Sequence, residues 1–181
     1  MANEKKMDQL LLGLLSHEPL SGYEIKKRID TGVSLFWSAS YGSIYPTLRE
    51  LEARGFVTKK QIADTGRNKH SYTITDGGRQ HLLDWLSISG SKDELRYETL
   101  LKIFFCGEAC DDTALKHIHE FAEKSERMLS ILQFYYENLE NLQDEPAHRY
   151  YILTVKFGIK TYQAYLEWCK EAVEQLEGMK D

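Results

Sequence analysis

Apolar residues recur every three or four positions from the start of the chain, which is the period of an amphipathic helix. The apolar positions of this first segment are Met7, Leu10, Leu11, Leu14 and Leu15. Pro19 interrupts the pattern, and Ser21 followed by Glu24 has the spacing of a capping box at a helix start. We therefore expect a second helix over residues 22–30, ended by Gly32.

A third helix is expected before Gly55, because a new apolar stripe with helical spacing appears there. The residues of this stripe are Tyr41, Ile44, Leu48 and Leu51. The residues of the opposite face are Gly42, Ser43, Pro46, Arg49, Glu50 and Ala53. Small side chains on that face let the helix approach another surface closely. Ser40 and Ser43 are both candidates for the N-cap; Pro46 fits the first turn if Ser43 is the cap, and implies a kink otherwise.

Two short segments rich in β-forming residues follow, over residues 56–62 and 69–75. They bracket a glycine-containing loop at residues 64–68, and this arrangement predicts a β-hairpin. Thr75 then has the place of an N-cap for a fourth helix. The apolar residues of that helix are Leu82, Leu83, Trp85 and Leu86. A helix-turn-helix followed by a hairpin is the order of a winged helix-turn-helix domain, which we assign to residues 1–88.

The second half of the chain is predicted to be helical throughout, after a small polar linker at residues 87–92. One helix is expected over residues 95–106. Two long helices follow, and their apolar positions alternate three and four apart, as in coiled coils. The first seam consists of Leu115, Ile118, Ala122, Ser125, Leu129, Leu132, Tyr136 and Leu139. The second seam consists of Ile152, Val155, Ile159, Tyr162, Leu166, Cys169, Val173 and Leu176.

The last helix is apolar beyond its seam. These additional residues are Leu153, Phe157, Ala164 and Trp168. A helix that is apolar on more than one side has to be covered on more than one side, and two long helices cannot do that alone. We therefore predict a mainly α-helical protein with a small β-hairpin, in which an all-helical C-terminal domain at residues 93–181 joins two copies of the chain as a homodimer.

The charge of the chain is divided unevenly between its halves. The formal net charge is −5. Residues 1–90 contain 12 Lys and Arg against 10 Asp and Glu, whereas residues 91–181 contain 11 against 18. An acidic surface repels phosphate, so contact with nucleic acid is expected in the first half, where the positive side chains must cluster.

The sequence contains no motif of a known enzyme class. It lacks a glycine-rich phosphate-binding loop, a nucleophile elbow and a zinc-protease helix, so neither catalytic residues nor a cofactor are expected. Cys106, Cys110, His117 and His119 lie close in sequence, but paired C-x-x-C spacing is missing and no metal site is predicted. There is no apolar run of membrane length and no secretory signal, and three cysteines fit a reducing compartment. We expect a cytoplasmic protein.

Contacts with double-stranded DNA are expected from the second helix, the start of the third helix and the hairpin tip. The candidate residues are Lys26, Lys27, Ser40, Tyr41, Ser43, Tyr45, Arg49, Arg67 and Lys69. Ser43 and Tyr45 would lie near bases, Arg49 near a phosphate or a guanine edge, and the basic tip near the DNA backbone. Alternatively, Tyr45 only packs against the second helix, and the other residues form an ordinary solvated surface.

Aromatic residues on both sides of the linker are candidates for binding a small, largely apolar effector. They are Trp37, Trp85, Tyr162 and Trp168. A ligand bound among them would change the distance between the two recognition helices of a dimer. Core packing alone is the alternative for these residues.

Six motifs of the first half together resemble the PadR-type transcriptional regulators. They are LLGLLS at 11–16, SGYEI at 21–25, FWSAS at 36–40, GSIYPTL at 42–48, LEARGFV at 51–57 and YTITDGG at 72–78. Residues 96–105 resemble the start of the long C-terminal domain of the larger PadR subfamily. The resemblance implies a homodimeric repressor that is joined through its C-terminal helices and released from DNA by a small ligand; phenolic acids gave the family its name. Many relatives carry Pro where this chain has Tyr41, so groove contacts are expected to differ there. A winged helix that binds a protein instead of DNA is the alternative function.

Overall fold

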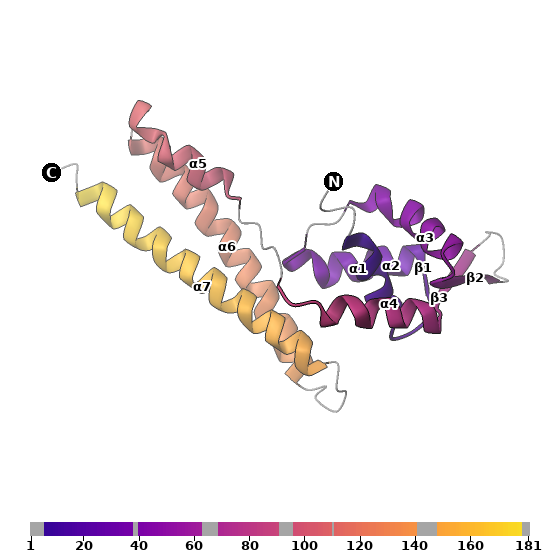
Figure 1. Ribbon diagram of the computed structural model, residues 1–181. Helices are drawn as coiled ribbons and strands as arrows, with labels where there is room; N and C mark the ends of the chain where they lie inside the picture. Colours follow the sequence, from indigo (N-terminus) through magenta and orange to yellow (C-terminus); the bar gives the residue numbers. More distant parts are fainter. Residues whose placement is uncertain are drawn as a thin grey trace. The chain divides into compact units, whose positions relative to one another are not determined.

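The computed structural model describes residues 6–37, 40–62, 69–90, 96–109, 111–140 and 148–178. The chain divides into two compact units, residues 1–92 and residues 93–181, and each is described by itself (Figure 1). None of the helices in the described ranges combines the length and the hydropathy that crossing a bilayer requires.

The N-terminal unit has the winged helix-turn-helix arrangement. Its helices are α1 (Met7–Leu15), α2 (Gly22–Thr31), α3 (Ile44–Ala53) and α4 (Asp76–Ser87), with short 3-10 turns η2 (Val33–Leu35) and η3 (Tyr41–Ser43) between α2 and α3. Its strands are β1 (Leu20–Ser21), β2 (Val57–Ile62) and β3 (Lys69–Ile74). They form an antiparallel sheet in the order β1-β3-β2, so that β2 and β3 make the predicted hairpin.

The core of this unit lies where α1 packs against α3 and α4. Its fully buried large apolar residues are Leu11, Leu12, Leu15, Ile25, Ile29, Leu48, Leu51 and Val57. The predicted caps of α2 and α4 are confirmed. The Ser21 hydroxyl accepts from the Glu24 amide at 3.3 Å while the Glu24 carboxylate accepts from the Ser21 amide at 2.7 Å. The Thr75 hydroxyl accepts from the Gly78 amide at 3.0 Å.

The helix α3 begins three residues after Tyr41, where the predicted apolar stripe starts, and it ends in a tight turn. It starts at Ile44, which places Pro46 in the first turn. Ser43 holds the N-cap position but its side chain does not cap; its hydroxyl donates to the Ser40 carbonyl at 2.6 Å. Past the C-terminus, Gly55 has a φ of 73°, and the Phe56 amide returns to the Leu51 carbonyl at 2.9 Å. This left-handed cap turns the chain directly into β2.

The prediction that Tyr41 belongs to the buried stripe of α3 is wrong. Tyr41 lies in η3, and its side chain is 44% exposed, whereas Ile44, Leu48 and Leu51 are buried as expected. A 3-10 turn has three residues per turn instead of 3.6, so a side chain one turn before the helix does not stay on the α-helical stripe.

The C-terminal unit consists of α5 (Glu98–Phe104), a 3-10 turn η4 (Cys106–Glu108), and the long helices α6 (Asp111–Glu140) and α7 (His148–Gly178). Figure 1 shows α6 and α7 side by side, with α5 next to α6. The predicted helix over residues 95–106 was too long. Its described part ends at Phe104, because the chain tightens into η4 before α6 begins.

The seam between α6 and α7 is the predicted one. Ile118, Ser125 and Leu132 of α6 are buried, as are Val155 and Cys169 of α7. The two helices are in close contact at Gly158, where an added Cβ would lie 3.0 Å from a methyl carbon of Leu132. Of the apolar residues off this seam, Leu153 and Phe157 are 62% and 71% exposed and Ala164 is also exposed, whereas Trp168 is half-buried next to Phe121. The second apolar side of α7 is therefore uncovered around Leu153 and Phe157 within the described part of this unit.

Candidate nucleic-acid interface

The predicted DNA-contacting residues of the N-terminal unit lie on α2, η3 and α3. Those with exposed side chains are Lys26, Lys27, Ser40, Tyr41, Tyr45 and Arg49, and Ser43 is half-buried. Contacts link the three elements: the Lys26 ammonium lies 5.0 Å from the ring centroid of Tyr41, and the ring of Tyr45 lies against Gly22. Arg49 is one helical turn beyond Tyr45, on the same side of α3. The helix-turn-helix thus presents hydroxyl, phenol and cationic groups on adjoining elements.

Tyr45 is held by its contact with the start of α2. A Cβ placed on Gly22 would fall 2.5 Å from the ring of Tyr45, so any larger residue at this position would have to displace the ring. The side chain of Tyr45 is nevertheless 54% exposed. The ring therefore packs on α2, as the alternative interpretation had it, while a large part of its surface stays accessible. That its hydroxyl contacts a base stays a prediction.

Replacing Tyr45 by phenylalanine is expected to keep the ring on Gly22 and to remove only the hydroxyl. A direct base contact contributes about 1–3 kcal/mol of discrimination, so the variant should lose about fivefold or more of its preference for operator over random DNA. Fluorescence anisotropy with both DNAs measures this ratio. Tyr23→Phe, at an exposed tyrosine of α2, is the matched control. An unchanged ratio in Tyr45→Phe would mean that the phenol does not read the sequence.

The β2–β3 hairpin, which is the wing of this domain, adds cations that the sequence interpretation missed. Lys59 and Lys60 are exposed on β2, where they pair across the hairpin with Tyr72 and Ser71. Two consecutive lysines in a strand point to opposite faces of the sheet, and this alternation was the signal available in the sequence. Of the two predicted tip residues, Arg67 lies outside the described residues. Lys69 is described only in its backbone, which pairs with Ile62.

The base of the wing adjoins the exposed side of α3. Burial, and then the negative charge of Glu52, raise the pKa of the Tyr72 phenol, while the Arg49 guanidinium acts to lower it. Tyr72 is almost completely buried in the centre of the sheet. Since Glu52 and Arg49 both belong to α3, this helix lies near β3, and it also contacts β2 at the base of the hairpin.

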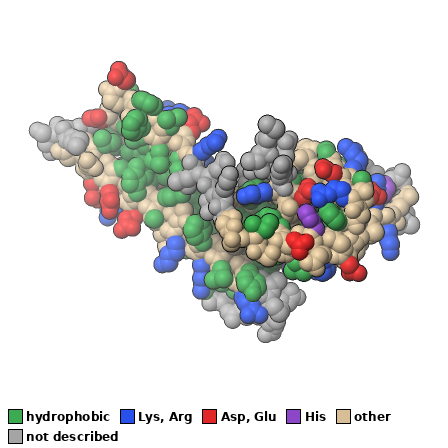
Figure 2. Space-filling model, in the orientation of Figure 1, with side chains coloured by type: hydrophobic (Ala, Val, Ile, Leu, Met, Phe, Trp, Pro, Cys, Tyr) green, Lys and Arg blue, Asp and Glu red, His purple; other side chains and the backbone are tan. Residues whose placement is uncertain are grey.

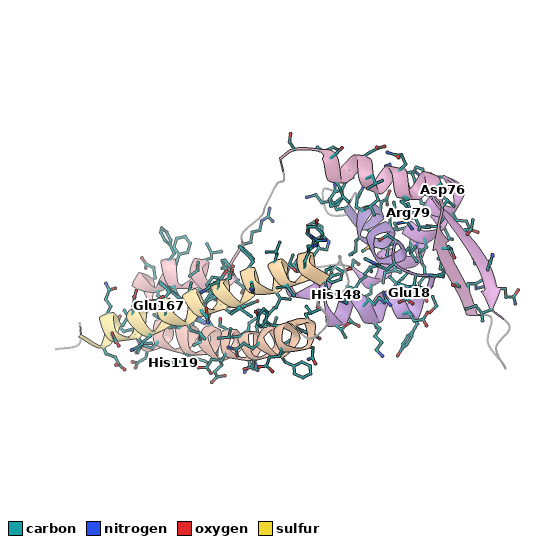
Figure 3. The ribbon with its side chains drawn as sticks, turned by 90° about the horizontal axis from the view of Figure 1, so that it is seen from below. Glu18, Asp76, Arg79, His119, His148 and Glu167 are labelled. Atoms are coloured by element: carbon teal, nitrogen blue, oxygen red, sulfur yellow. The ribbon has the colours of Figure 1, made fainter. Side chains whose placement is uncertain are left out.

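Several other cations of this unit hold the fold together. Arg28 forms an ion pair with Glu18. Arg54 pairs with Asp8 at 2.7 Å and stacks its guanidinium over Phe56. Arg79 of α4 donates to the Ser16 carbonyl at 3.2 Å (Figure 3). These arginines are therefore poor candidates for DNA contact.

The predicted effector-binding residues fall in both units. In the N-terminal unit, the Lys6 ammonium lies 5.2 Å from the Trp37 ring, and Trp85 is 38% exposed on α4. In the C-terminal unit, Tyr162 and Trp168 belong to an aromatic cluster, whose other rings are Tyr97, Phe121 and Tyr165. Ring centroids in this cluster are 5.5 to 6.1 Å apart.

The aromatic cluster of the C-terminal unit is partly polar. The hydroxyls of Tyr97 and Tyr165 form a hydrogen bond. Burial is the first cause, and this hydrogen bond the second, of a strong rise in the pKa of Tyr165. Burial also raises the pKa of Tyr162. Tyrosine phenols are neutral at physiological pH even without such a shift, so the cluster adds polar hydroxyls but no charge to this unit.

Among the described residues no group of three or more His, Cys, Asp and Glu is placed to hold a metal ion. Cys110 lies outside the described residues, and His119 is exposed on α6 (Figure 3).

Comparison with known proteins gives matches over both halves. Residues 11–84 match the transcriptional regulator PadR-like family, and residues 95–177 match the family described as the virulence activator alpha C-terminal domain. The negative transcriptional regulator PadR of Bacillus subtilis is 30% identical over 174 residues, which are 92% of this chain and 95% of that protein.

Solved structures match over nearly the whole length. The crystal structure of a PadR-like transcriptional regulator from Bacillus cereus has a TM-score of 0.82 at 32% identity, covering 96% of this chain and 99% of that one. Bacillus subtilis PadR in complex with operator DNA has a TM-score of 0.82 at 31% identity, covering 93% and 98%. The same regulator in complex with p-coumaric acid has a TM-score of 0.77 at 30% identity, covering 94% and 98%.

Proposed function

Since the chain belongs to the PadR-like family of transcriptional regulators, we propose that it is a homodimeric repressor. It binds a pseudo-palindromic operator through α3 and the β2–β3 wing, and a small ligand releases it. It acts where the chromosome is, in the cytoplasm, and it is not an enzyme. The observation that carries the proposal is the set of exposed hydroxyl, phenol and cationic side chains on the adjoining elements α2, η3 and α3, on a fold shared with a relative that binds operator DNA.

DNA binding is supported by the kind of groups on this surface. Hydroxyls and phenols at the start of α3 suit hydrogen bonding to base edges in the major groove. The exposed lysines of α2 and β2 flank α3 in the fold and suit phosphate contacts, which position the protein without reading sequence. Arg49 lies between these groups and suits either role.

Dimerisation is supported by apolar side chains that the C-terminal unit leaves exposed. They gather on α5, where Phe104 is 80% exposed, and on the uncovered side of α7. Figure 2 shows hydrophobic side chains gathered over the α5 end of this unit. Exposed apolar patches of this kind indicate an interface with another protein. Two-fold symmetry then implies operator half-sites with centres about 10 bp, or a multiple of 10 bp, apart.

Release by a ligand is supported by the relative that binds p-coumaric acid. Each unit by itself contains candidate aromatic residues for effector binding, which are Trp37 and Trp85 in the N-terminal unit and Tyr162 and Trp168 in the C-terminal unit. A ligand that relieves repression tenfold has to bind the released state about 1.4 kcal/mol better than the DNA-bound state. Titration with planar aromatic compounds should therefore quench tryptophan fluorescence and lower operator affinity over the same concentration range.

Replacing Arg67 and Lys69 together by alanine is expected to weaken binding to operator and random DNA alike. Each neutralised phosphate contributes about −0.9 to the slope of log affinity against log salt concentration, so the slope should flatten by about two. Gel shifts on DNA from upstream of the gene, repeated over a range of salt, measure both quantities.

The matched control for the wing variant is Lys124→Ala with Lys170→Ala. It removes two exposed cations from the acidic C-terminal unit and should leave affinity and slope unchanged. A wing variant with wild-type affinity and slope would exclude a phosphate clamp at the tip. If the wild-type protein shifts no DNA, a protein-binding winged helix becomes the better account.

A further inference from the structure

The carboxylate of Asp30 lies in an unfavourable place for a DNA-binding surface. It is exposed in the last turn of α2, one turn after Lys26. Carboxylates in the last turn of a helix are disfavoured by the negative end of the helix dipole. They also repel phosphates that approach the neighbouring lysines. Without a compensating partner, the Asp30 carboxylate would therefore destabilise α2 and weaken the binding of DNA to this surface.

The structure gives this carboxylate a hydrogen-bond partner from η3. The hydroxyl of Tyr41 donates to Asp30, and the ring of the same tyrosine carries the Lys26 ammonium at 5.0 Å from its centroid. The Ser34 hydroxyl also donates to the main-chain carbonyl of Asp30, at 2.8 Å. The hydrogen bond to Asp30 is the first cause of a raised pKa at Tyr41, which keeps the phenol protonated and able to donate. We name the three side chains of Asp30, Tyr41 and Lys26 the clasp.

We propose that Tyr41 is a positioning residue for DNA recognition, which fixes η3 and the start of α3 on α2 and engages the Asp30 carboxylate, rather than a residue that contacts DNA through its hydroxyl. This inference rests on the proposed DNA-binding function. Tyr41 restrains the backbone of η3 through a side-chain tie to α2.

A double-mutant cycle on Tyr41 and Asp30 tests the proposal with operator DNA. Tyr41→Phe keeps the ring under Lys26 but removes the hydrogen bond to the carboxylate, and should weaken operator binding about twofold to fivefold, the loss expected for one hydrogen bond. Asp30→Asn removes the charge and should bind at least as tightly as wild type. In the Asp30→Asn background, Tyr41→Phe should raise the logarithm of the operator Kd by less than about half of the increase that it causes in the wild type. Tyr23→Phe controls for the loss of an exposed phenol from α2.

The cycle separates positioning from contact. If the Tyr41 phenol contacts DNA directly, Tyr41→Phe should lower operator affinity by the same factor with Asp30 and with Asn at position 30. Equal losses would therefore overturn the proposal. An unchanged operator affinity in Tyr41→Phe would overturn it as well. Tyr41→Phe, Asp30→Asn and the double variant change only polar groups at exposed positions. Thermal unfolding followed by circular dichroism should therefore show all three to be as stable as the wild type.

A second measurement examines the clasp without DNA. In protein labelled with 13C at the tyrosine Cζ atoms, the Tyr41 signal of Asp30→Asn should move away from its wild-type position, because the hydroxyl then has an amide oxygen instead of a carboxylate as its acceptor. The Tyr23 signal is the internal reference and should stay in place. A Tyr41 signal at the same position in both proteins would overturn the clasp whether or not the protein binds DNA.

Discussion

Replacing Gly78 by alanine is expected to destabilise the N-terminal unit by about 3 kcal/mol or more, the upper part of the range for overpacking a core. A Cβ on Gly78 would lie 2.1 Å from the carbonyl oxygen of Phe56 and 2.9 Å from its carbonyl carbon. These are backbone atoms, so no side-chain rotation relieves the clash. The same carbonyl accepts from the Thr75 amide at 3.0 Å, and Thr75 caps α4. The start of α4 and the start of β2 therefore cannot separate without losing the cap.

The neighbouring glycine provides a matched control. A Cβ on Gly77 would have its nearest heavy atoms at 3.7 and 3.9 Å, which is ordinary contact. Alanine is favoured over glycine within helices, so Gly77→Ala should stabilise by about 0.5–1 kcal/mol. Urea unfolding of the full chain, with amide exchange in α4 as a second probe, measures both variants. Similar effects at the two positions would contradict the close approach of α4 to β2.

The parts of the fold that the sequence predicted are those with local signals. The capping box at Ser21 and the cap at Thr75 need only residues three apart, and both formed as expected. The seam of α6 through Ile118 and Leu132 also follows from periodicity alone. Gly55 marked the end of α3 because a tight turn into a strand requires a positive φ.

The failures have a common physical cause, which is that the deciding contact lies elsewhere in the sequence. Tyr41 satisfied the helical period, but the chain enters α3 through a 3-10 turn and Asp30 holds the phenol outside the core. The contact of Tyr45 with Gly22 joins residues 23 positions apart, so local patterns left packing on the second helix as one of two interpretations. Lys59 and Lys60 were missed for a different reason, since the prediction placed the positive charge of the hairpin at its tip and not on its strands.

Adding negative charge to the uncovered side of α7 is expected to dissociate the dimer and, through it, to abolish tight operator binding. Leu153 and Phe157 lie one turn apart on this side and are exposed in the chain by itself. In a dimer they would be buried against the partner, where an unpaired carboxylate is strongly disfavoured. Leu153→Asp with Phe157→Asp should therefore sediment as a monomer at concentrations where the wild type is a dimer.

Operator affinity should fall far more than affinity for a single half-site in this variant. Linking two binding modules raises the overall affinity by about 100-fold to 10,000-fold, because the second contact becomes intramolecular. A monomer loses that gain while its η3, α3 and wing stay intact, so half-site binding should hardly change. Gln163→Asp with Gln175→Asp adds the same charge at exposed polar positions of α7 and is the matched control. If the Leu153 and Phe157 variant still sediments as a dimer, the partner covers α5 or another surface, and the apolar side of α7 needs a different explanation.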